Sequence, residues 1–315
     1  MAVKTEFTPD DFAEILSQYD VGIYLDSEAI QQGTVQTNFF LETTKGKFVF
    51  RYYENRTKES VLFESHLLSF LVKQGFPCAS QIESTTGSCV NIYRHKPYAL
   101  FEFVDGQPVE NPTDHHKQQL IETAAQLQKL TADYYSPYTE YRWNYSPELC
   151  QTLAQAAAKQ LNNKDANNKL AWLTDQLAML ELPASLPKGV CHCDFHFSNI
   201  LFKRDELVAL LDFDDANYTF SQFDLIGMIE YWACPYPANT PDMACAQKIA
   251  QAYEQYRPLV ASEQNHLYDV YKLSILFDCI WCFARGSSED FYEKRKIAAL
   301  ANLGRQNFCQ QLFPN

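Results

Sequence analysis

The sequence has little glycine and few basic residues for its size. Its 315 residues include only 10 glycines, and no stretch carries the spacing G-x-G-x-x-G of many nucleotide-binding loops. Lys and Arg number 26 against 39 Asp and Glu, which gives a formal net charge of −13. Because binding to a nucleic-acid backbone requires a basic face, we expect no nucleic-acid partner. A nucleotide, which needs only a few local donors, is not excluded.

Long apolar runs are also missing. Charged residues interrupt every apolar stretch well short of the ~20 residues that a membrane span needs, so we expect no membrane partner. The first residues, MAVKTEFTPDDF, show no basic segment followed by an apolar one, so we expect no secretory signal. Ten cysteines without such a signal predict reduced thiols in the cytoplasm, with disulfides as the alternative.

The chain is long enough for two domains of roughly 150 residues each. Hydrophobic residues make up 46% and charged residues 21%, which predicts a packed core and not disorder. The first part is rich in strands. A hairpin is expected over 34–53 around the turn TTKGK, with further strands near 88–93 and 97–104 and helices over 8–19 and 59–74.

Helical patterns dominate from residue 113 onward. One strand–turn–strand pattern, NILFKRDELVALLDFD at 199–214, interrupts them. We therefore expect an α+β fold, with an antiparallel-sheet lobe over 1–106 and a larger, mainly helical lobe over 107–315. The helices are expected at 113–130 and near 147–161, 165–180, 222–233, 241–256, 263–285 and 289–311.

The stretch GVCHCDFHFSNILF, residues 189–202, gathers cysteines, histidines and an aspartate. A zinc cage is one interpretation, but Cys191 and Cys193 are closer together than the usual C-x₂₋₄-C pair, and no second pair follows at a suitable spacing. Cys279 and Cys282 have C-x-x-C spacing inside an apolar helical pattern. Packing in a core is the simpler role for these thiols.

A second interpretation uses a different subset of the same stretch. His192, Asp194 and Asn199 form H-x-D-x-x-x-x-N, and Asp212 follows at the end of an apolar strand in LLDFDDA. Phosphoryl transfer needs a carboxylate that accepts the proton of the attacking hydroxyl. It also needs an amide and a second carboxylate that hold Mg²⁺ against the phosphates. The pattern therefore predicts a phosphotransferase.

HCDFHFSNILF followed by LLDFDDA resembles the catalytic and metal-binding segments of the aminoglycoside-phosphotransferase and choline-kinase superfamily, which has a protein-kinase-like fold. The resemblance implies that Asp194 is the catalytic base, that His192 braces its loop, and that Asn199 and Asp212 bind Mg²⁺. It also implies Asp214 as a further metal ligand, with a solvated turn acid as the alternative. His196, also matched, either packs the loop or contacts substrate.

The same resemblance extends to the first lobe and implies that ATP is the phosphate donor. Arg51 in KFVFRYY stands where the superfamily places the cation that meets the phosphates, and Glu64 on the next helix is the acid that holds it. The segment ALFEFVDGQPV resembles the hinge whose backbone pairs with adenine, near Glu102 and Val104. Gly33 is the single glycine of the expected phosphate loop.

Within the superfamily, the segments 1–22, 33–54 and 75–82 resemble type II homoserine kinases most. This implies a small amino alcohol as acceptor, with L-homoserine as the best guess. A choline- or ethanolamine-type acceptor is the alternative, since the aromatic segment 132–147 is able to form a cage for a quaternary cation, and an aminoglycoside is another. A non-catalytic nucleotide-binding protein of the same fold also remains open, as does the oligomeric state.

Overall fold

The computed structural model describes residues 4–31, 35–285 and 292–314. The chain forms two compact units. The sheet unit contains Met1–Asn111, Tyr135–Arg142 and Phe197–Asp214, and the helical unit contains Pro112–Tyr134, Trp143–His196 and Asp215–Asn315. The sheet unit thus takes two segments from the later part of the chain, and the expected boundary after residue 106 stays a prediction.

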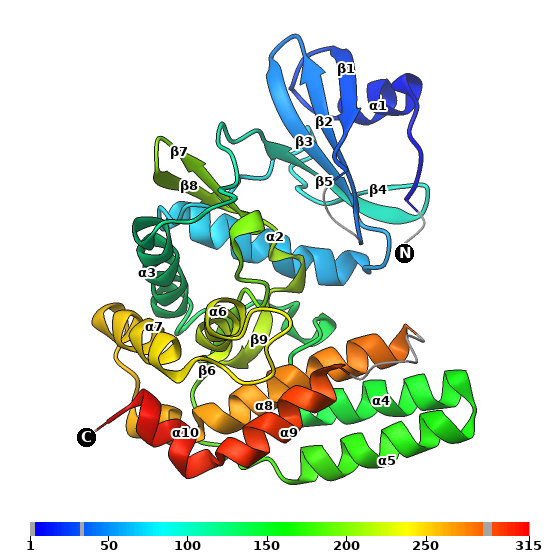
Figure 1. Cartoon of the computed structure of the whole chain (residues 1–315). Helices are drawn as coiled ribbons and strands as arrows, with labels where there is room; N and C mark the ends of the chain where they lie inside the picture. Colours follow the sequence, from blue (N-terminus) through cyan, green and yellow to red (C-terminus); the bar gives the residue numbers. More distant parts are fainter. Residues whose placement is uncertain (1–3, 32–34, 286–291, 315) are drawn as a thin grey trace. The chain divides into compact units, whose positions relative to one another are not determined.

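The core of the sheet unit is an antiparallel sheet with the strand order β1-β2-β3-β5-β4 (Figure 1). The predicted hairpin is confirmed as β2 and β3, which pair from Thr37–Tyr52 to Thr43–Gly46. The strands are β1 (Tyr24–Ala29), β2 (Thr37–Thr43), β3 (Gly46–Tyr52), β4 (Asn91–Tyr93) and β5 (Lys96–Glu102).

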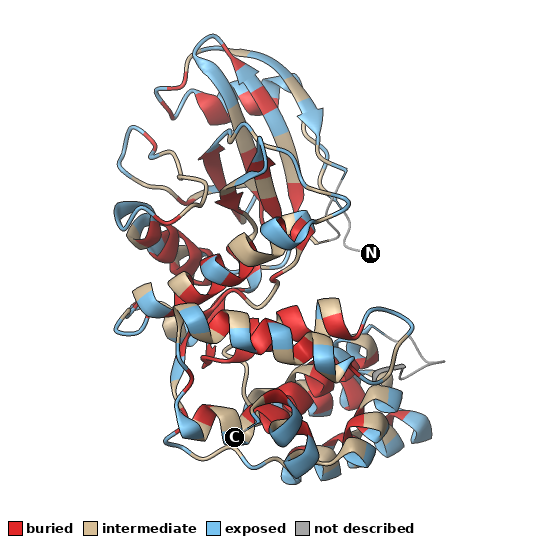
Figure 2. Ribbon diagram, turned by 60° about the vertical axis from the view of Figure 1, so that its left-hand side comes forward, coloured by how far each residue is buried: buried red, intermediate tan, exposed pale blue. Residues whose placement is uncertain are grey.

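Helix α1 (Pro9–Leu16) begins at a capping box in which Thr8 and Asp11 exchange side-chain and backbone hydrogen bonds. Its Phe12 and Ile15 are fully buried in an aromatic core with Phe50 from β3 and Tyr98 from β5. Figure 2 colours the chain by burial and shows buried segments within the strands of this unit. The core therefore fixes β3, a central strand, between two neighbours.

Helix α2 (Lys58–Lys73) packs against β5 and against the short 3₁₀ helix η1 (Thr139–Tyr141). The predicted strand–turn–strand is confirmed as β7 (Ile200–Lys203) and β8 (Glu206–Leu210), preceded by the 3₁₀ turn η2 (Phe197–Asn199). Two bridges, Cys78 to Leu210 and Gln107 to Phe202, attach this hairpin to the rest of the sheet unit.

The helical unit is organised around α8 (Ala261–Ala284), which packs against α4, α5, α6, α9 and α10. The predicted single helix over 289–311 is wrong at its centre: Gly304, with φ of 78°, separates two helices. The remaining helices are α3 (Asp114–Leu130), α4 (Pro147–Leu161), α5 (Lys164–Ala178), α6 (Phe223–Ala233), α7 (Met243–Tyr256), α9 (Tyr292–Leu303) and α10 (Arg305–Leu312).

A strand pair that the sequence analysis did not predict lies in the helical unit. Strand β6 (Lys188–Cys191) pairs antiparallel with β9 (Asn217–Phe220), and Cys191 stands opposite Asn217. The first half of the cysteine–histidine stretch is therefore the end of a buried strand and the start of the loop that follows it. The α+β class is confirmed, with a sheet-bearing unit and a larger, mainly helical one.

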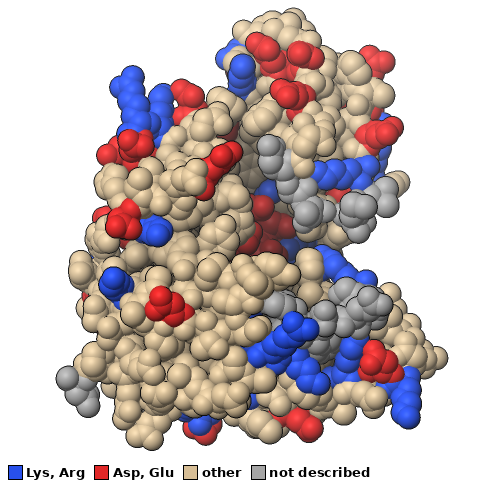
Figure 3. All heavy atoms as spheres, viewed as in Figure 1, with Lys and Arg blue, Asp and Glu red and all other residues tan. Residues whose placement is uncertain are grey.

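The surface and the helices are consistent with the composition. On the face drawn in Figure 3, Lys and Arg side chains stand singly or in small groups among acidic and uncharged ones. Of the helices within the described ranges, none combines the length and the apolar character that crossing a bilayer requires. All ten cysteines have free thiols in the structure.

Candidate active site

The β7–β8 hairpin brings Asn199 and Asp212 to the same end of the sheet unit. The amide of Leu211 donates to the carbonyl of Asn199 at 2.7 Å, directly beyond the pair Ile200–Leu210. Asp212 then leaves the strand with φ of 63°, in the left-handed region that few residues other than glycine adopt. Such backbone strain is concentrated at functional sites, where surrounding contacts maintain it.

Arg51 lies on β3, between β2 and β5. Its guanidinium group contacts the carboxylates of Asp212 and Glu64. Nη2 lies 2.8 Å from Oδ1 of Asp212, and Nη1 lies 3.7 Å from Oε1 of Glu64. Nε donates to Oδ1 of Asn38 on β2 at 3.1 Å. Burial lowers the pKa of Arg51, but the charge of Asp212 outweighs this effect and raises it. The cation is therefore fixed and permanently charged.

Glu64 lies on the buried face of α2, one turn after Ser60 and one turn before Leu67 and Leu68. Its side chain is only 1% exposed, and burial raises its pKa to about 7, although the nearby charge of Arg51 opposes this. Oε2 is buried and accepts no hydrogen bond from the described residues. A carboxylate in such surroundings is costly unless a cation or ligand accompanies it.

The expected adenine-binding segment follows the end of β5. Glu102 is the last residue of β5 and donates its amide to the carbonyl of Ser80 at 2.9 Å. Val104, half-buried, lies beyond the sheet ladder. Gly33 of the expected phosphate loop lies outside the described residues.

Asp214 is buried, unlike a solvated turn acid. Its carboxylate accepts hydrogen bonds from Arg56 and from Gln36. Burial raises its pKa, but Arg56 and Arg51 outweigh the desolvation, so the pKa is lowered. Asp212 differs in that its side chain is 35% exposed, which leaves carboxylate surface available to a ligand.

The loop after β6, in the helical unit, carries His192 and Asp194. His192 is fully buried, and its Nδ1 accepts the amide of Asp194 at 3.3 Å. This contact agrees with a bracing role. Asp224, at the start of α6, accepts the amides of His192 at 3.0 Å and of Cys193 at 2.9 Å. Cys193 has φ of 64°, which is a strained backbone conformation directly before Asp194. The two hydrogen bonds to the carboxylate of Asp224 maintain this conformation.

Sequence reasoning missed Asp224. Its carboxylate is buried, and burial raises its pKa although His192 and the two backbone amides oppose this. The available signal was an acid in the first turn of a predicted helix, a position that the helix dipole also explains. Only the contact with the loop after β6 shows that Asp224 binds the amides of His192 and Cys193 in addition to complementing the helix dipole.

Asp194 is half-buried and faces His196. The Nε2 of His196 lies 3.1 Å from Oδ1 of Asp194, and its ring stacks on Tyr231 at 5.8 Å between centroids. His196 therefore orients the carboxylate of the expected base and is itself supported by α6.

The cysteines of the same loop have other partners. Cys191 donates to the carbonyl of Phe220 at 3.3 Å, and the sulfur of Cys193 accepts from Asn217 at 3.1 Å. Burial raises the pKa of Cys193 well above its ordinary value, whereas a zinc ligand must be a thiolate. In residues 4–31, 35–285 and 292–314, no three His, Cys, Asp or Glu side chains form a metal-binding cluster.

Two solved structures that share the fold are an antibiotic kinase and an antibiotic phosphotransferase. An amicoumacin kinase in complex with AMP-PNP, Ca²⁺ and amicoumacin aligns with a TM-score of 0.63 and 17% identity over 96% of this chain and 97% of its own. A spectinomycin phosphotransferase in complex with ADP and spectinomycin aligns with a TM-score of 0.63 and 13% identity, covering 97% of each chain. The fold is thus protein-kinase-like, as expected.

Residues 26–259 match the family described as "Phosphotransferase enzyme family", and the chain belongs to that family. It is similar to the homoserine kinase of Bartonella tribocorum, with 29% identity over 85% of this chain and 83% of the relative. It is also similar to that of Methylobacterium radiotolerans, with 31% identity over 84% and 81%. The protein is an ATP-dependent phosphotransferase that acts on a small molecule, which confirms the predicted class.

The predicted residues are distributed over both units. In the sheet unit, Arg51 contacts Glu64 and Asp212, and Asn199 lies at the same hairpin end. In the helical unit, His192 contacts the amide of Asp194. Their roles in catalysis remain predictions.

Proposed function

We propose that this protein is a homoserine kinase that transfers the γ-phosphate of ATP to the hydroxyl of L-homoserine. The observation that supports the acceptor best is the similarity to homoserine kinases, at 27–31% identity over at least 84% of this chain. The loop and hairpin that carry Asp194, Asn199 and Asp212 lie within the matched family range. A non-catalytic relative is disfavoured because all three residues are present.

In the proposed reaction, the acceptor oxygen bonds to the γ-phosphorus while the bond from that phosphorus to the β,γ-bridging oxygen breaks. Asp194 accepts the hydroxyl proton, and ADP leaves. Nε2 of His196 lies 3.1 Å from the carboxylate of Asp194, and Nδ1 of His192 accepts its backbone amide at 3.3 Å, which suits a base that must hold one orientation. Orientation of the acceptor by a fixed base contributes a large part of such a rate enhancement.

We propose that Asn199 and Asp212 bind Mg²⁺ together with the nucleotide. An amide oxygen and one partly exposed carboxylate suit an ion that keeps several waters and relies on phosphate oxygens for other ligands. When bound, the ion neutralises charge on the phosphates. Asp214 is expected as a further ligand from the sequence, but its contacts favour another role, argued below.

The nucleotide-binding roles remain those expected from the sequence. Arg51 donates to phosphate oxygens and Glu64 holds it, which agrees with their approach of 3.7 Å. The backbone near Glu102 and Val104 pairs with adenine, and Gly33 belongs to the phosphate loop. Ten free thiols suit a reducing compartment, so we propose a cytoplasmic location.

L-Homoserine carries a carboxylate and an ammonium group, so its site needs a cation. We propose Arg285, whose guanidinium lies 3.4 Å from the ring centroid of Trp281 at the end of α8. Arg285 is exposed, and partial burial lowers its pKa although the nearby charge of Asp215 opposes this. The alternative, an aromatic cage for choline, would have to use other residues than Tyr138, which packs against His66 of α2 at 5.2 Å, whereas Tyr135 and Tyr141 are exposed.

ADP release measured with a coupled assay over a panel of acceptors tests the proposal. We expect kcat/KM to be highest for L-homoserine and to fall at least tenfold for choline, ethanolamine and an aminoglycoside. Arg285→Gln should raise the KM for homoserine and leave the KM for ATP unchanged. A preference for choline, or equal turnover of ethanolamine, would overturn the homoserine assignment and leave the phosphotransferase class standing.

A further inference from the structure

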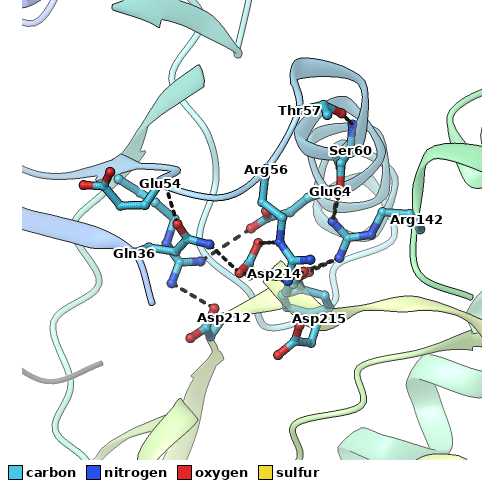
Figure 4. Close-up of polar contacts among 12 residues, drawn as sticks. Gln36, Glu54, Arg56, Thr57, Ser60, Glu64, Arg142, Asp212, Asp214 and Asp215 are labelled. Carbon is cyan, nitrogen blue, oxygen red and sulfur yellow. Dashed lines mark hydrogen bonds and ion pairs between the residues drawn. The ribbon is translucent and has the colours of Figure 1, made fainter. Parts of the chain in front are cut away.

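Asp214 lies at the centre of a buried polar cluster in the sheet unit (Figure 4). Four segments meet there: Gln36 at the start of the β2 region, Arg56 before α2, Arg142 after η1, and Asp214 itself. We call these four residues the Asp214 cluster. Asp214 follows Asp212 by two residues. Contacts that hold Asp214 in place therefore also restrict the backbone at Asp212, the proposed metal ligand after β8.

The carboxylate of Asp214 is fully engaged. Arg56 donates from Nε to Oδ1 at 2.9 Å and from Nη2 to Oδ2 at 3.2 Å, which is the two-pronged geometry of strong Arg–carboxylate pairs. Nε2 of Gln36 donates to Oδ2 at 2.7 Å. The side chain is only 8% exposed, so a metal ion would have to displace these donors from a buried position.

Arg142 holds the backbone of the same segment. It donates to the carbonyls of Phe213 and Asp214, and Nη1 donates to the carbonyl and the hydroxyl of Ser60 at 3.2 and 3.0 Å. Ser60 belongs to the first turn of α2. Glu64 lies one turn further along the same helix. Arg142 comes from the aromatic segment whose role the sequence did not reveal, and its side chain is buried.

Gln36 extends the cluster to β3. Its Oε1 accepts the amide of Glu54 at 2.7 Å, and Glu54 follows the strand that carries Arg51 by two residues. Arg56 and Gln36 bond the carboxylate of Asp214, and Arg142 bonds its backbone carbonyl. Through these contacts three groups of the proposed site are tied to Asp214: Asp212, the helix of Glu64 and the strand of Arg51.

We propose that Asp214 is a positioning residue that aligns Asp212 with Arg51 and Glu64, and that it is not a metal ligand. The inference rests on the proposed role of Asp212 in binding Mg²⁺. It also explains why the chain has an acid at this position: the side chain pairs with Arg56, which is only 16% exposed, and adds negative charge near the buried Arg142, and an unpaired buried cation is strongly unfavourable. The aromatic segment then serves as the support that carries Arg142.

Mg²⁺-dependent binding of ADP, measured by calorimetry at several Mg²⁺ concentrations, separates the two roles without requiring turnover. Asp212→Asn should raise the Mg²⁺ concentration for half-maximal ADP affinity at least tenfold. Asp214→Asn should shift that concentration less than Asp212→Asn does, and by about as much as Arg142→Lys, which keeps both carboxylates, while kcat falls at least tenfold. A shift in Asp214→Asn as large as that in Asp212→Asn would make Asp214 a metal ligand, and an unchanged kcat in Asp214→Asn would remove it from the site altogether.

Hydrogen exchange of the nucleotide-free protein tests the positioning itself. Arg142→Lys keeps the charge but loses the guanidinium fork, so amides in the first turn of α2 and in 211–214 should exchange at least tenfold faster, as they should in Asp214→Asn. Arg204→Lys, in the exposed turn between β7 and β8, is the matched control and should leave exchange unchanged. Unchanged protection in both cluster variants would overturn the proposal. If Asp212→Asn does not change the Mg²⁺ dependence while the cluster variants still lose protection, the proposed metal site is wrong and the structural role of the Asp214 cluster is retained.

Discussion

Glu64 offers a test of the site that depends on charge alone. Its side chain is 1% exposed, one oxygen lacks a hydrogen-bond partner among the described residues, and burial raises its pKa from 4.5 to about 7. Arg51 lies 3.7 Å away and shares its charge with Asp212. The substitution Glu64→Gln keeps the shape of the side chain and removes the proton equilibrium.

The sign of the expected effect follows from the direction of the shift. A folded-state pKa above the ordinary value means that the folded protein binds this proton more tightly than the unfolded chain. Stability from this group is therefore full below pH 4.5 and is lost as the pH rises to about 7. At about 1.4 kcal/mol per pH unit, the 2.5-unit interval corresponds to about 3 kcal/mol.

Urea unfolding followed by tryptophan fluorescence at pH 4.5, 6, 7 and 8 measures this difference. The free energy of unfolding of the wild type, relative to Glu64→Gln, should fall by about 3 kcal/mol between pH 4.5 and 8 and then level off. Other titrating groups cancel because both proteins contain them. Glu28→Gln, at an exposed position of β1, is the control. Equal pH dependence in the wild type and Glu64→Gln would refute the argument that Glu64 is protonated near neutral pH.

Three further substitutions test other parts of the structure. Asp194→Asn should lower kcat by about 10²–10⁴ in the coupled assay and leave ADP affinity unchanged, and normal turnover would exclude Asp194 as the base. Asp224→Asn keeps an acceptor for one of the amides of His192 and Cys193, places a donor against the other, and should lower the free energy of unfolding by about 1–3 kcal/mol in urea. Gly106→Ala places a methyl group 2.8 Å from Leu201 and should cost about 1–3 kcal/mol in the same measurement, whereas Gly227→Ala, with open space around it, should not destabilise.

Local sequence signals were sufficient to predict most helices and strands, because capping and turn residues mark where these elements begin and end. Thr8 caps α1 and Thr113 caps α3, as their patterns indicate. Strand β1, with the polar sequence YLDSEA, has little strand propensity and forms because it pairs with β2 at the sheet edge. The break at Gly304 was missed because the apolar spacing continues across it.

The candidate site was predictable where its chemistry is concentrated in short motifs. Asp194, Asn199 and Asp212 are separated by fixed, short spacings, and a hairpin fold follows from the pattern between the last two. The supporting residues come from distant segments: Arg142 is 72 positions from Asp214, and Asp224 is 32 from His192. No local periodicity encodes such contacts, since they arise only when the chain folds.

These distant contacts also account for two unusual backbone conformations. Cys193 and Asp212, one before the proposed base and one at the proposed metal site, both have φ near 64°, at 64° and 63°. Left-handed backbone costs roughly 1–2 kcal/mol in such residues, so folding selects it only where other bonds compensate. At Cys193 the compensation is the carboxylate of Asp224, and at Asp212 it is Arg51 together with the Asp214 cluster. Each strained turn thus has a buried charged partner, and weakening that partner should reorient the adjacent functional side chain before it unfolds the unit.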